Sequence, residues 1–357
     1  MSIDKKDTTS LFCLTPGGMD LAKRIRQFQP VKAFCPKKYV EAGFNAFEES
    51  FAQTITDRFR QDKALIVIGA TGIVVRVLAP YLTDKFHDPA VIVIDEKGQN
   101  VISLLSGHIG GANELTRYLA AALNANPVIT TATDVNEVSA LDSLSKEMKA
   151  ELQTPRDSVK TINQLLVSHK KVGLYVDPQL SNLTSFDISV FDTKGFIKLG
   201  HLEKKPVDLA AMVYVSIFTT DPYWPVPVHR LIPKRVVLGI GCRRGIDSRV
   251  LSLMVRTKLE ALHIEPLAVA QIGTIDIKGD ERALLDLADE YRIEELDLFA
   301  AQELHDCAAH FPSSPFVEKT VGVGSVSQPV AWLLSQGHII GETTKQNGIT
   351  ITVGVSQ

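Results

Sequence analysis

The chain has 357 residues, of which 45% are hydrophobic and 22% are charged, a balance typical of globular proteins. This length exceeds what one hydrophobic core usually holds, so we expect two or three domains. The net charge of -3 includes no block of like charges, which excludes a general DNA- or RNA-binding face but leaves room for local basic pockets.

The sequence indicates neither a membrane span nor a disulfide framework. Residues 1–7 are polar and lack the apolar core of a secretory leader. No apolar stretch reaches the roughly 18 residues that a membrane span needs. The four cysteines form no C-x-x-C pair, so we expect reduced thiols and a cytoplasmic protein. They are Cys13, Cys35, Cys242 and Cys307.

Strand-like and helix-like segments alternate from the start of the chain. Apolar runs at 11–14 and 31–35 predict strands, and the segment between them carries one apolar helix face. Five large apolar side chains then recur at spacings of three and four, which predicts a single face of one helix. They are Phe44, Phe47, Phe51, Ile55 and Phe59.

The next segment has the order of a mainly parallel sheet. Four more apolar runs predict strands, at 64–68, 90–94, 101–105 and 127–129. We expect helices from a glycine turn at 69–72 to about residue 82, at 112–123, and at 137–152. Strand, turn and helix in this order predict an α/β N-terminal domain over residues 1–135.

The order of elements changes beyond about residue 156. A helix near 159–169 precedes four short apolar runs with turns between them. The runs are 172–176, 186–190, 196–199 and 212–218. Strands that follow one another in this way predict a small α+β middle domain over residues 136–228.

Four prolines within twelve residues mark a joint between domains. They are Pro222, Pro225, Pro227 and Pro233. After the joint we expect a strand at 235–240, a helix at 247–262 capped by Asp247 or Ser248, and a closing strand at 349–355. These elements predict an α/β C-terminal domain over residues 233–357.

Four strand ends run into glycine-rich turns, at 69–72, 106–111, 239–245 and 322–325. Such a turn presents backbone N–H groups and the positive end of a helix dipole, and anions bind there. Each turn by itself is equally well explained as a tight connection. Four of them in one chain favour a ligand with several negative groups.

The first turn is compatible with a dinucleotide site, because Asp95 follows Gly72 by 23 positions. The third glycine of that fingerprint is missing, since Val75 stands in its place. Tyr81 and Lys85 form a Y-x-x-x-K pair that lies too close to the turn to reach a nicotinamide. An NAD(P)-dependent dehydrogenase is therefore the third alternative.

The second turn, at 106–111, places Ser106 and His108 among three glycines at a helix start. A histidine can move protons at neutral pH. The alternative is that His108 only hydrogen-bonds its own loop. A serine nucleophile is not favoured, because the turn lacks the G-x-S-x-G pattern.

Hydroxyls and a carboxylate follow the strand at 127–129, in the segment 130–134. Strand ends of this kind bind ligands in open α/β sheets. The alternative is a helix cap at Thr133 or Asp134, with Glu137 as its capping-box partner.

The third turn, at 239–245, contains G-x-G but has Arg244 where a nucleotide fingerprint needs glycine. Arg243 and Arg244 suit the bidentate pairing of carboxylates or phosphates, or else are a solvated pair of charges. The histidines are scattered and form no H-E-x-x-H motif, so we expect no metal held by the protein.

These segments together resemble one family. They are 68–76, 104–113, 130–134, 238–245, 324–327, and Lys345 with Gly348. The segment S-G-H-x-G-G-A-N is the most specific, and G-I-G-C-R-R-G is second. They resemble the CbiG family, the cobalt-precorrin-5A hydrolases of anaerobic cobalamin (vitamin B12) biosynthesis.

The resemblance implies a cobalt-bearing tetrapyrrole substrate edged with acetate and propionate groups. The family opens its ring A lactone with water and releases acetaldehyde, which gives cobalt-precorrin-5B. Cobalt would arrive with the substrate, so no cofactor is expected. Other cobalamin-pathway enzymes and a second copy of the chain stay open as partners, and nucleic acid and membrane are not expected.

The resemblance also suggests roles for particular residues. We expect His108 as base or acid, Asp134 or Glu114 as the carboxylate that orients it, and backbone N–H groups at 110–112 as oxyanion donors. We expect substrate binding by Gly69, Thr71, Gly72, Arg76, Ser106, Gly107, Gly110, Gly111, Asn113, Thr131, Arg243, Arg244, Ser325, Ser327 and Lys345.

A different class of function stays open at this point. The C-terminal region also resembles a stand-alone protein of aerobic cobalamin pathways. In this alternative, the chain is at least in part a non-catalytic corrinoid-binding or scaffolding protein, and any catalysis is confined to residues 1–150.

Overall fold

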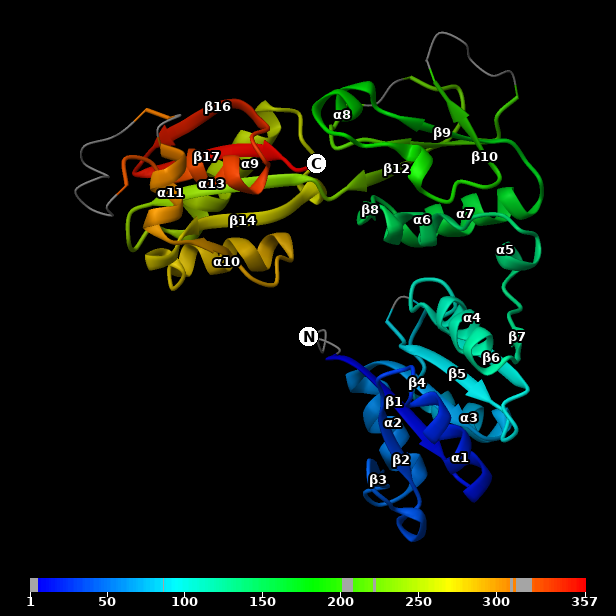
Figure 1. Ribbon diagram of the computed structural model, residues 1–357. Coiled ribbons are helices and arrows are strands. Elements are labelled where there is room, and N and C mark those ends of the chain that lie inside the picture. Colours follow the sequence, from blue (N-terminus) through cyan, green and yellow to red (C-terminus); the bar gives the residue numbers. More distant parts are fainter. Residues whose placement is uncertain (1–5, 86, 201–207, 221–222, 309–310, 313–322) are drawn as a thin grey trace. The chain divides into compact units, whose positions relative to one another are not determined.

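The computed structural model describes residues 6–85, 87–200, 208–220, 223–308, 311–312 and 323–357 (Figure 1). Its chain packs into two compact units, residues 1–143 and 144–357. Within this described part, no helix is both long enough and apolar enough to cross a membrane.

The first unit is built on a seven-stranded sheet with the order β3-β2-β1-β4-β5-β6-β7. The strands are β1 (Lys6–Cys13), β2 (Lys32–Cys35), β3 (Phe44–Ala46), β4 (Asp62–Ile68), β5 (Ala90–Ile94), β6 (Asn100–Leu105) and β7 (Asn126–Val128). The helices are α1 (Pro16–Ile25), α2 (Phe51–Gln61), α3 (Thr71–Leu78), α4 (Ala112–Leu123) and α5 (Ala132–Val135), and α6 (Leu141–Glu147) crosses the boundary between the units.

Alternate side chains of the central strands form two separate cores, one on each face of the sheet. Leu11, Ile66 and Ile92 pack with α1 and α4 on one face. Phe12 and Leu65 pack with α2 and α3 on the other. A sheet buried on both faces explains why these strands are continuous apolar runs in the sequence.

One strand pair breaks the parallel pattern of this sheet. All neighbouring strands run parallel except β5 and β6, which are antiparallel, with Val91 opposite Leu105 and Ile94 opposite Val101. Because β7 is parallel to β6, the ends of β6 and β7 both lie at the edge of the sheet where β4 and β5 begin.

Two predicted helices are wrong in extent. Phe44 lies in β3 and Phe47 follows that strand, and the two side chains pack into cores on opposite faces of the sheet. The helix starts only at Phe51, because the Ser50 hydroxyl accepts a hydrogen bond from the Gln53 amide and caps it. The spacing of the first two phenylalanines matches a helix by coincidence.

The predicted helix over 137–152 is also wrong. Glu137 and Lys149 adopt left-handed backbone angles, with φ of 54° and 49°, which a helix cannot contain. Between them the chain forms only α6, and β8 (Ala150–Leu152) follows. The predicted strand at 186–190 is a short 3₁₀-helix over Ile188–Val190 instead.

The second unit contains two five-stranded sheets, and most of their strand pairs are parallel. The first has the order β10-β9-β11-β12-β8, with β9 (Val172–Val176), β10 (Phe196–Leu199), β11 (Ala211–Val215), β12 (Val228–Pro233) and helices α7 (Pro155–Val167) and α8 (Pro178–Leu183). Of its strands only β8 is antiparallel to its neighbour.

The last sheet has the order β15-β14-β13-β17-β16. Its strands are β13 (Val236–Cys242), β14 (Val269–Ile275), β15 (Asp297–Phe299), β16 (Ile339–Gln346) and β17 (Ile349–Val355), and its helices are α9 (Ser248–Ala261), α10 (Arg282–Tyr291), α11 (Ala301–Ala308) and α13 (Ser327–Leu334). Asp247 caps α9 as predicted, by accepting from the Arg249 and Val250 amides. The predicted mixed α/β class is confirmed, and the predicted domain boundaries stay a prediction.

Glycines let α13 lie close against the last sheet. A Cβ on Gly239 would lie 2.1 Å from the Ser327 carbonyl oxygen and 2.6 Å from the Ala331 nitrogen. One on Gly273 would lie 2.7 Å from Val330. The α13 backbone therefore occupies the space that a side chain at Gly239 would need, and α13 side chains occupy the space beside Gly273.

We predict that Gly239→Ala destabilises the second unit. The added methyl group meets backbone atoms that have no room to move, so the free energy of unfolding should fall by about 3 kcal/mol. Thermal unfolding followed by circular dichroism measures this. Gly200→Ala is the matched control, because a Cβ there has no neighbour within 4 Å. Equal midpoints for the two variants would contradict the packing argument.

Candidate active site

The loop after β6 has a backbone that only particular residues allow. Ser106 and Gly111 have positive φ angles of 57° and 81°. A Cβ on Gly110 would lie 2.5 Å from the Ser106 Cβ, so glycine is required there. The Ala112 and Asn113 amides donate to the carbonyls of Ser106 and Gly107 at 3.1 and 2.9 Å. The loop therefore folds back on the start of α4.

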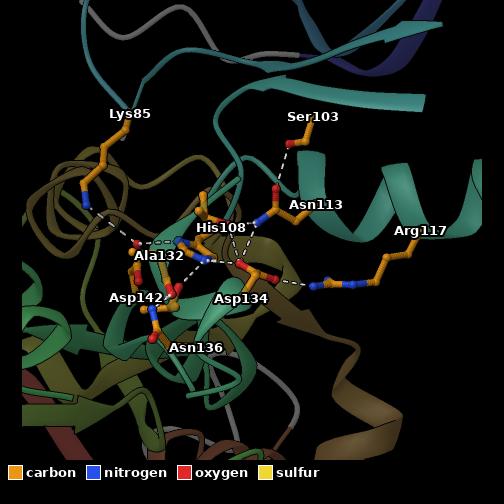
Figure 2. A network of polar contacts seen from close by, with 11 residues as sticks. Lys85, Ser103, His108, Asn113, Arg117, Ala132, Asp134, Asn136 and Asp142 are labelled. Carbon is orange, nitrogen blue, oxygen red and sulfur yellow. Dashed lines mark hydrogen bonds and ion pairs between the residues drawn. The ribbon is translucent and has the colours of Figure 1, made fainter. Parts of the chain in front are cut away.

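His108 projects from this loop toward side chains that follow β7 (Figure 2). Its Nε2 lies 2.9 Å from Asp134 Oδ2 and 2.9 Å from Thr133 Oγ1. Its Nδ1 lies 3.7 Å from Asp142 Oδ2. The side chain is 19% exposed. The alternative that His108 only bonds its own loop is wrong.

Asp134 is the most connected carboxylate of the group. It accepts hydrogen bonds from Thr131 Oγ1 at 2.5 Å and from Asn113 Nδ2 at 2.9 Å, and its Oδ1 accepts from the guanidinium of Arg117. Burial raises the pKa of the Asp134 carboxyl, but bonds from Thr131, Arg117 and His108 outweigh burial and hold that pKa below its usual value. Asp134 is therefore ionised across the neutral range.

Asn113 fixes the arrangement from the first turn of α4. It is buried, and its Oδ1 accepts a hydrogen bond from Ser103 Oγ at 2.7 Å. Nδ2 faces Thr131 Oγ1 and Asp134 Oδ2, each at 2.9 Å, and the ionised carboxylate assigns the amide because it can only accept a hydrogen bond. The amide thus joins β6 to the segment after β7.

The helix-cap alternative for the segment 130–134 is wrong. Thr131 occupies the N-cap position of α5, but its side chain accepts no hydrogen bond from a backbone amide of the helix, and Thr133 and Asp134 lie inside the helix. Their side chains contact His108 instead. Glu114 is exposed in the first turn of α4, so the carboxylate that meets His108 is Asp134.

Two of the three amides expected as oxyanion donors serve the loop itself. The Gly111 amide donates to the His108 carbonyl at 3.0 Å, and the Ala112 amide donates to Ser106. The Ser106 hydroxyl donates to the Asp88 carbonyl at 2.9 Å. The hydrogen bonds of these groups therefore hold the loop in its fold.

The first glycine turn lies at the other edge of the sheet. Gly69 follows β4, and its amide donates to the carbonyl of Ile94 at the end of β5. The His108 loop lies at the start of β5, whose five residues span roughly 16 Å. The fold therefore does not bring this turn, with Thr71, Gly72 and Arg76, together with His108. The Arg76 guanidinium instead donates to the Gly72 carbonyl.

The third turn uses its first glycines for packing. Gly239 makes room for α13, and a Cβ on Gly241 would lie 2.6 Å from Thr350 Oγ1. Arg244 is ion-paired with Asp280 at 3.0 Å, with both side chains exposed. Burial raises the pKa of the Cys242 thiol to about 11, so this thiol stays protonated at neutral pH.

The remaining predicted binding residues belong to the last sheet. Lys345 and Arg243 are exposed, and the Arg243 amide donates to the Gly348 carbonyl of the adjacent β16–β17 turn. Ser325 is half-buried before α13. Ser327 is buried and accepts from Thr352 Oγ1 at 3.1 Å, so its hydroxyl is not open to a ligand. Residue 322 of the fourth turn lies outside the described residues.

Sequence reasoning missed several members of the site. No sequence motif contains Asp142, Arg117 or Ser103, and Lys85 is part only of the Y-x-x-x-K pair. Arg117 stands four positions after Asn113, which places both on one face of α4 and is the one usable signal. Among the described residues, no group of three or more His, Cys, Asp or Glu side chains could hold a metal ion.

Comparison with known proteins matches this chain to an established family. The family model described as Cobalamin synthesis G N-terminal matches residues 53–134, and the one described as Cobalamin synthesis G C-terminus matches 236–354. The chain is 51% identical to a cobalt-precorrin-5A hydrolase from Salmonella typhimurium, over 100% of both chains. It is 32% identical to another from Priestia megaterium, over 99% of this chain and 96% of the relative.

Solved structures of cobalamin proteins are more distant. A cobalamin biosynthesis protein G homologue from Sulfolobus solfataricus is 19% identical over 100% of this chain and 99% of that chain, with a TM-score of 0.41. CobE, from the cobalamin biosynthetic pathway, is 24% identical over 35% of this chain and 93% of that chain, with a TM-score of 0.33.

We predict a pH-dependent stability loss in Asp134→Asn. The folded pKa of Asp134 is depressed, so its ionic bonds stabilise the fold above its unfolded pKa and are lost as the pH falls through the folded value. The free energy of unfolding at pH 7 should fall by about 1–2 kcal/mol.

The measurement is thermal unfolding of both proteins between pH 3 and pH 7. The gap between their midpoints should be constant near neutrality and shrink in acid. A gap that widens toward low pH would show that the sign of the Asp134 effect is wrong.

Proposed function

The chain belongs to the CbiG family of cobalt-precorrin-5A hydrolases, and we propose that His108 carries the proton transfers of this hydrolysis. The family assignment rests on matches to both the N- and C-terminal family models and on 51% identity to a hydrolase over the full length of the chain. The chain is therefore an enzyme that acts on the cobalt tetrapyrrole cobalt-precorrin-5A. The comparisons favour neither the non-catalytic corrinoid-binding alternative nor the dehydrogenase.

The reaction sets clear demands on the site. Water adds to the carbonyl carbon of the ring A lactone, and a base must take one of its protons as the C–O bond forms. The tetrahedral oxyanion collapses with loss of the alkoxide. The alkoxide oxygen then becomes the carbonyl oxygen of acetaldehyde as the bond between its carbon and the macrocycle breaks, and that carbon leaves with its methyl group. The macrocycle keeps the electron pair of the broken bond and takes up a proton. A group that first accepts and then returns a proton serves both steps.

The hydrogen bonds of His108 indicate which nitrogen does this. Asp134 is ionised and only accepts hydrogen bonds, so the Nε2 that meets it carries the ring proton. The Nδ1 atom then keeps its lone pair and acts as the base. Asp134, held by Arg117, Asn113 and Thr131, orients the ring and stabilises the charge that follows protonation.

The binding residues of the substrate stay proposals. Arg243 and Lys345 are exposed cations that suit the carboxylates of a tetrapyrrole rim. Ser106, Asn113 and Thr131 support the loop and the Asp134 carboxylate, so we assign them to shaping the site.

We propose that cobalt enters the site as part of the substrate and that the enzyme needs no cofactor of its own. A cytoplasmic location is supported by four unpaired cysteines, of which Cys13, Cys35 and Cys307 are buried. A homodimer and contacts with other cobalamin-pathway enzymes stay predictions.

The activity is tested by anaerobic incubation of the purified protein with cobalt-precorrin-5A. We expect acetaldehyde, trapped as a hydrazone, in equal amount to the lactone lost. Tight binding of the substrate without acetaldehyde would instead support the corrinoid-binding alternative. Binding of NAD(P) in a parallel titration would reopen the dehydrogenase alternative.

His108→Ala should lower kcat by at least roughly 10²-fold, the usual loss for an acid–base group, with thermal unfolding close to that of the wild type. Steady-state assays of acetaldehyde release measure this. His169→Ala is the matched control, because His169 is exposed after α7 in the second unit. A near-normal kcat for the His108 variant would remove it from the chemistry.

A further inference from the structure

The side of His108 that faces away from Asp134 also meets a carboxylate. Asp142 Oδ2 lies 3.7 Å from Nδ1, the nitrogen that acts as the base. The Asp142 side chain is 2% exposed and stands in the first turn of α6. The same oxygen lies 3.8 Å from the Lys85 ammonium, whose side chain is 55% exposed (Figure 2).

Among the described residues, four segments of the first unit supply charged groups around His108. Asp134 comes from α5, Asp142 from the start of α6, Arg117 from α4, and Lys85 from the loop before β5. Asp134 forms an ion pair with Arg117, and Asp142 forms one with Lys85. The imidazole ring therefore lies between two ion pairs.

This placement has a consequence when His108 takes a proton. The new positive charge is shared between Nε2 and Nδ1, and a carboxylate oxygen lies on each side of it. Opposite charges at about 4 Å attract more strongly where solvent is partly excluded than they do in bulk water. Asp142 favours protonated His108, and Lys85 opposes it by offsetting the charge of Asp142.

We propose that Asp142 is a positioning residue for the hydrolysis: its carboxylate stabilises protonated His108. Lys85 sets the strength of this stabilisation. The inference rests on the proposed role of His108 as the base. A purely structural role is the competing explanation, since an acidic residue in the first turn of α6 also stabilises the helix dipole. The two explanations differ in their effect on the pH profile.

The test compares Asp142→Asn with Lys85→Met in the full-length protein. As a base, His108 is inactive when protonated, so kcat/KM falls on the acid side of its pH profile. Loss of the Asp142 charge should move this acid limb to lower pH by about one unit and lower kcat at the optimum by roughly tenfold. Loss of the Lys85 charge should move the limb the opposite way, to higher pH.

Lys97→Met is the matched control, because Lys97 is exposed in the turn after β5, at the far edge of the sheet. Its acid limb should coincide with that of the wild type. In the double variant Asp142→Asn/Lys85→Met, the lysine change should move the limb less than it does alone, because Lys85 acts through Asp142.

The outcomes separate this inference from the proposed function. A fully active His108→Ala variant would overturn both. An inactive His108→Ala variant with unmoved acid limbs in the other two would overturn only the role of Asp142. If Asp142→Asn does not fold, Lys85→Met still tests the inference, because Lys85 is exposed and its loss should leave the fold intact. The inference is overturned if the acid limb of Lys85→Met stays in place or moves to lower pH.

Discussion

The antiparallel pairing of β6 with β5 is the constraint on which the active site depends. In a fully parallel sheet, the loop after β6 would lie beside the Gly69–Gly72 turn. Because β6 reverses and β7 runs parallel to it, the loops after both strands meet at the edge where β5 begins. His108 and Asp134 therefore contact each other across 26 positions of the sequence.

Asp134 and Asp142 at this edge each have a cationic partner, and this pairing lowers the free-energy cost of holding two carboxylates beside His108. Two carboxylates on either side of one imidazole would repel each other, but Arg117 and Lys85 each offset one of them. The cations are about half exposed, which limits the cost of desolvating them, while the carboxylates are mostly buried. Hydrogen bonds to Asp134 gain strength from this partial exclusion of water.

Glycine serves two different purposes in the two units. In the first unit, Gly110 and Gly111 let the His108 loop fold back on itself. In the second, Gly239 lets the backbone of α13 approach the sheet. The sequence pattern was the same in both places, a strand followed by glycines, and it predicted anion binding in each. The loop of the first unit brings a histidine against the two carboxylates of Asp134 and Asp142, whereas the turn after β13 brings Arg244 against Asp280.

The sequence by itself determined the central buried strands, the α/β class and the family, because buried strands need continuous apolar runs and the His108 loop needs its glycines. It also indicated His108 and Asp134, whose local segments are distinctive. The tertiary structure alone decided the direction of β6, the separation of Gly69 from His108, and the approach of Asp142. Those depend on which strands pair and on left-handed residues such as Glu137, and neither leaves a periodic signal in the sequence.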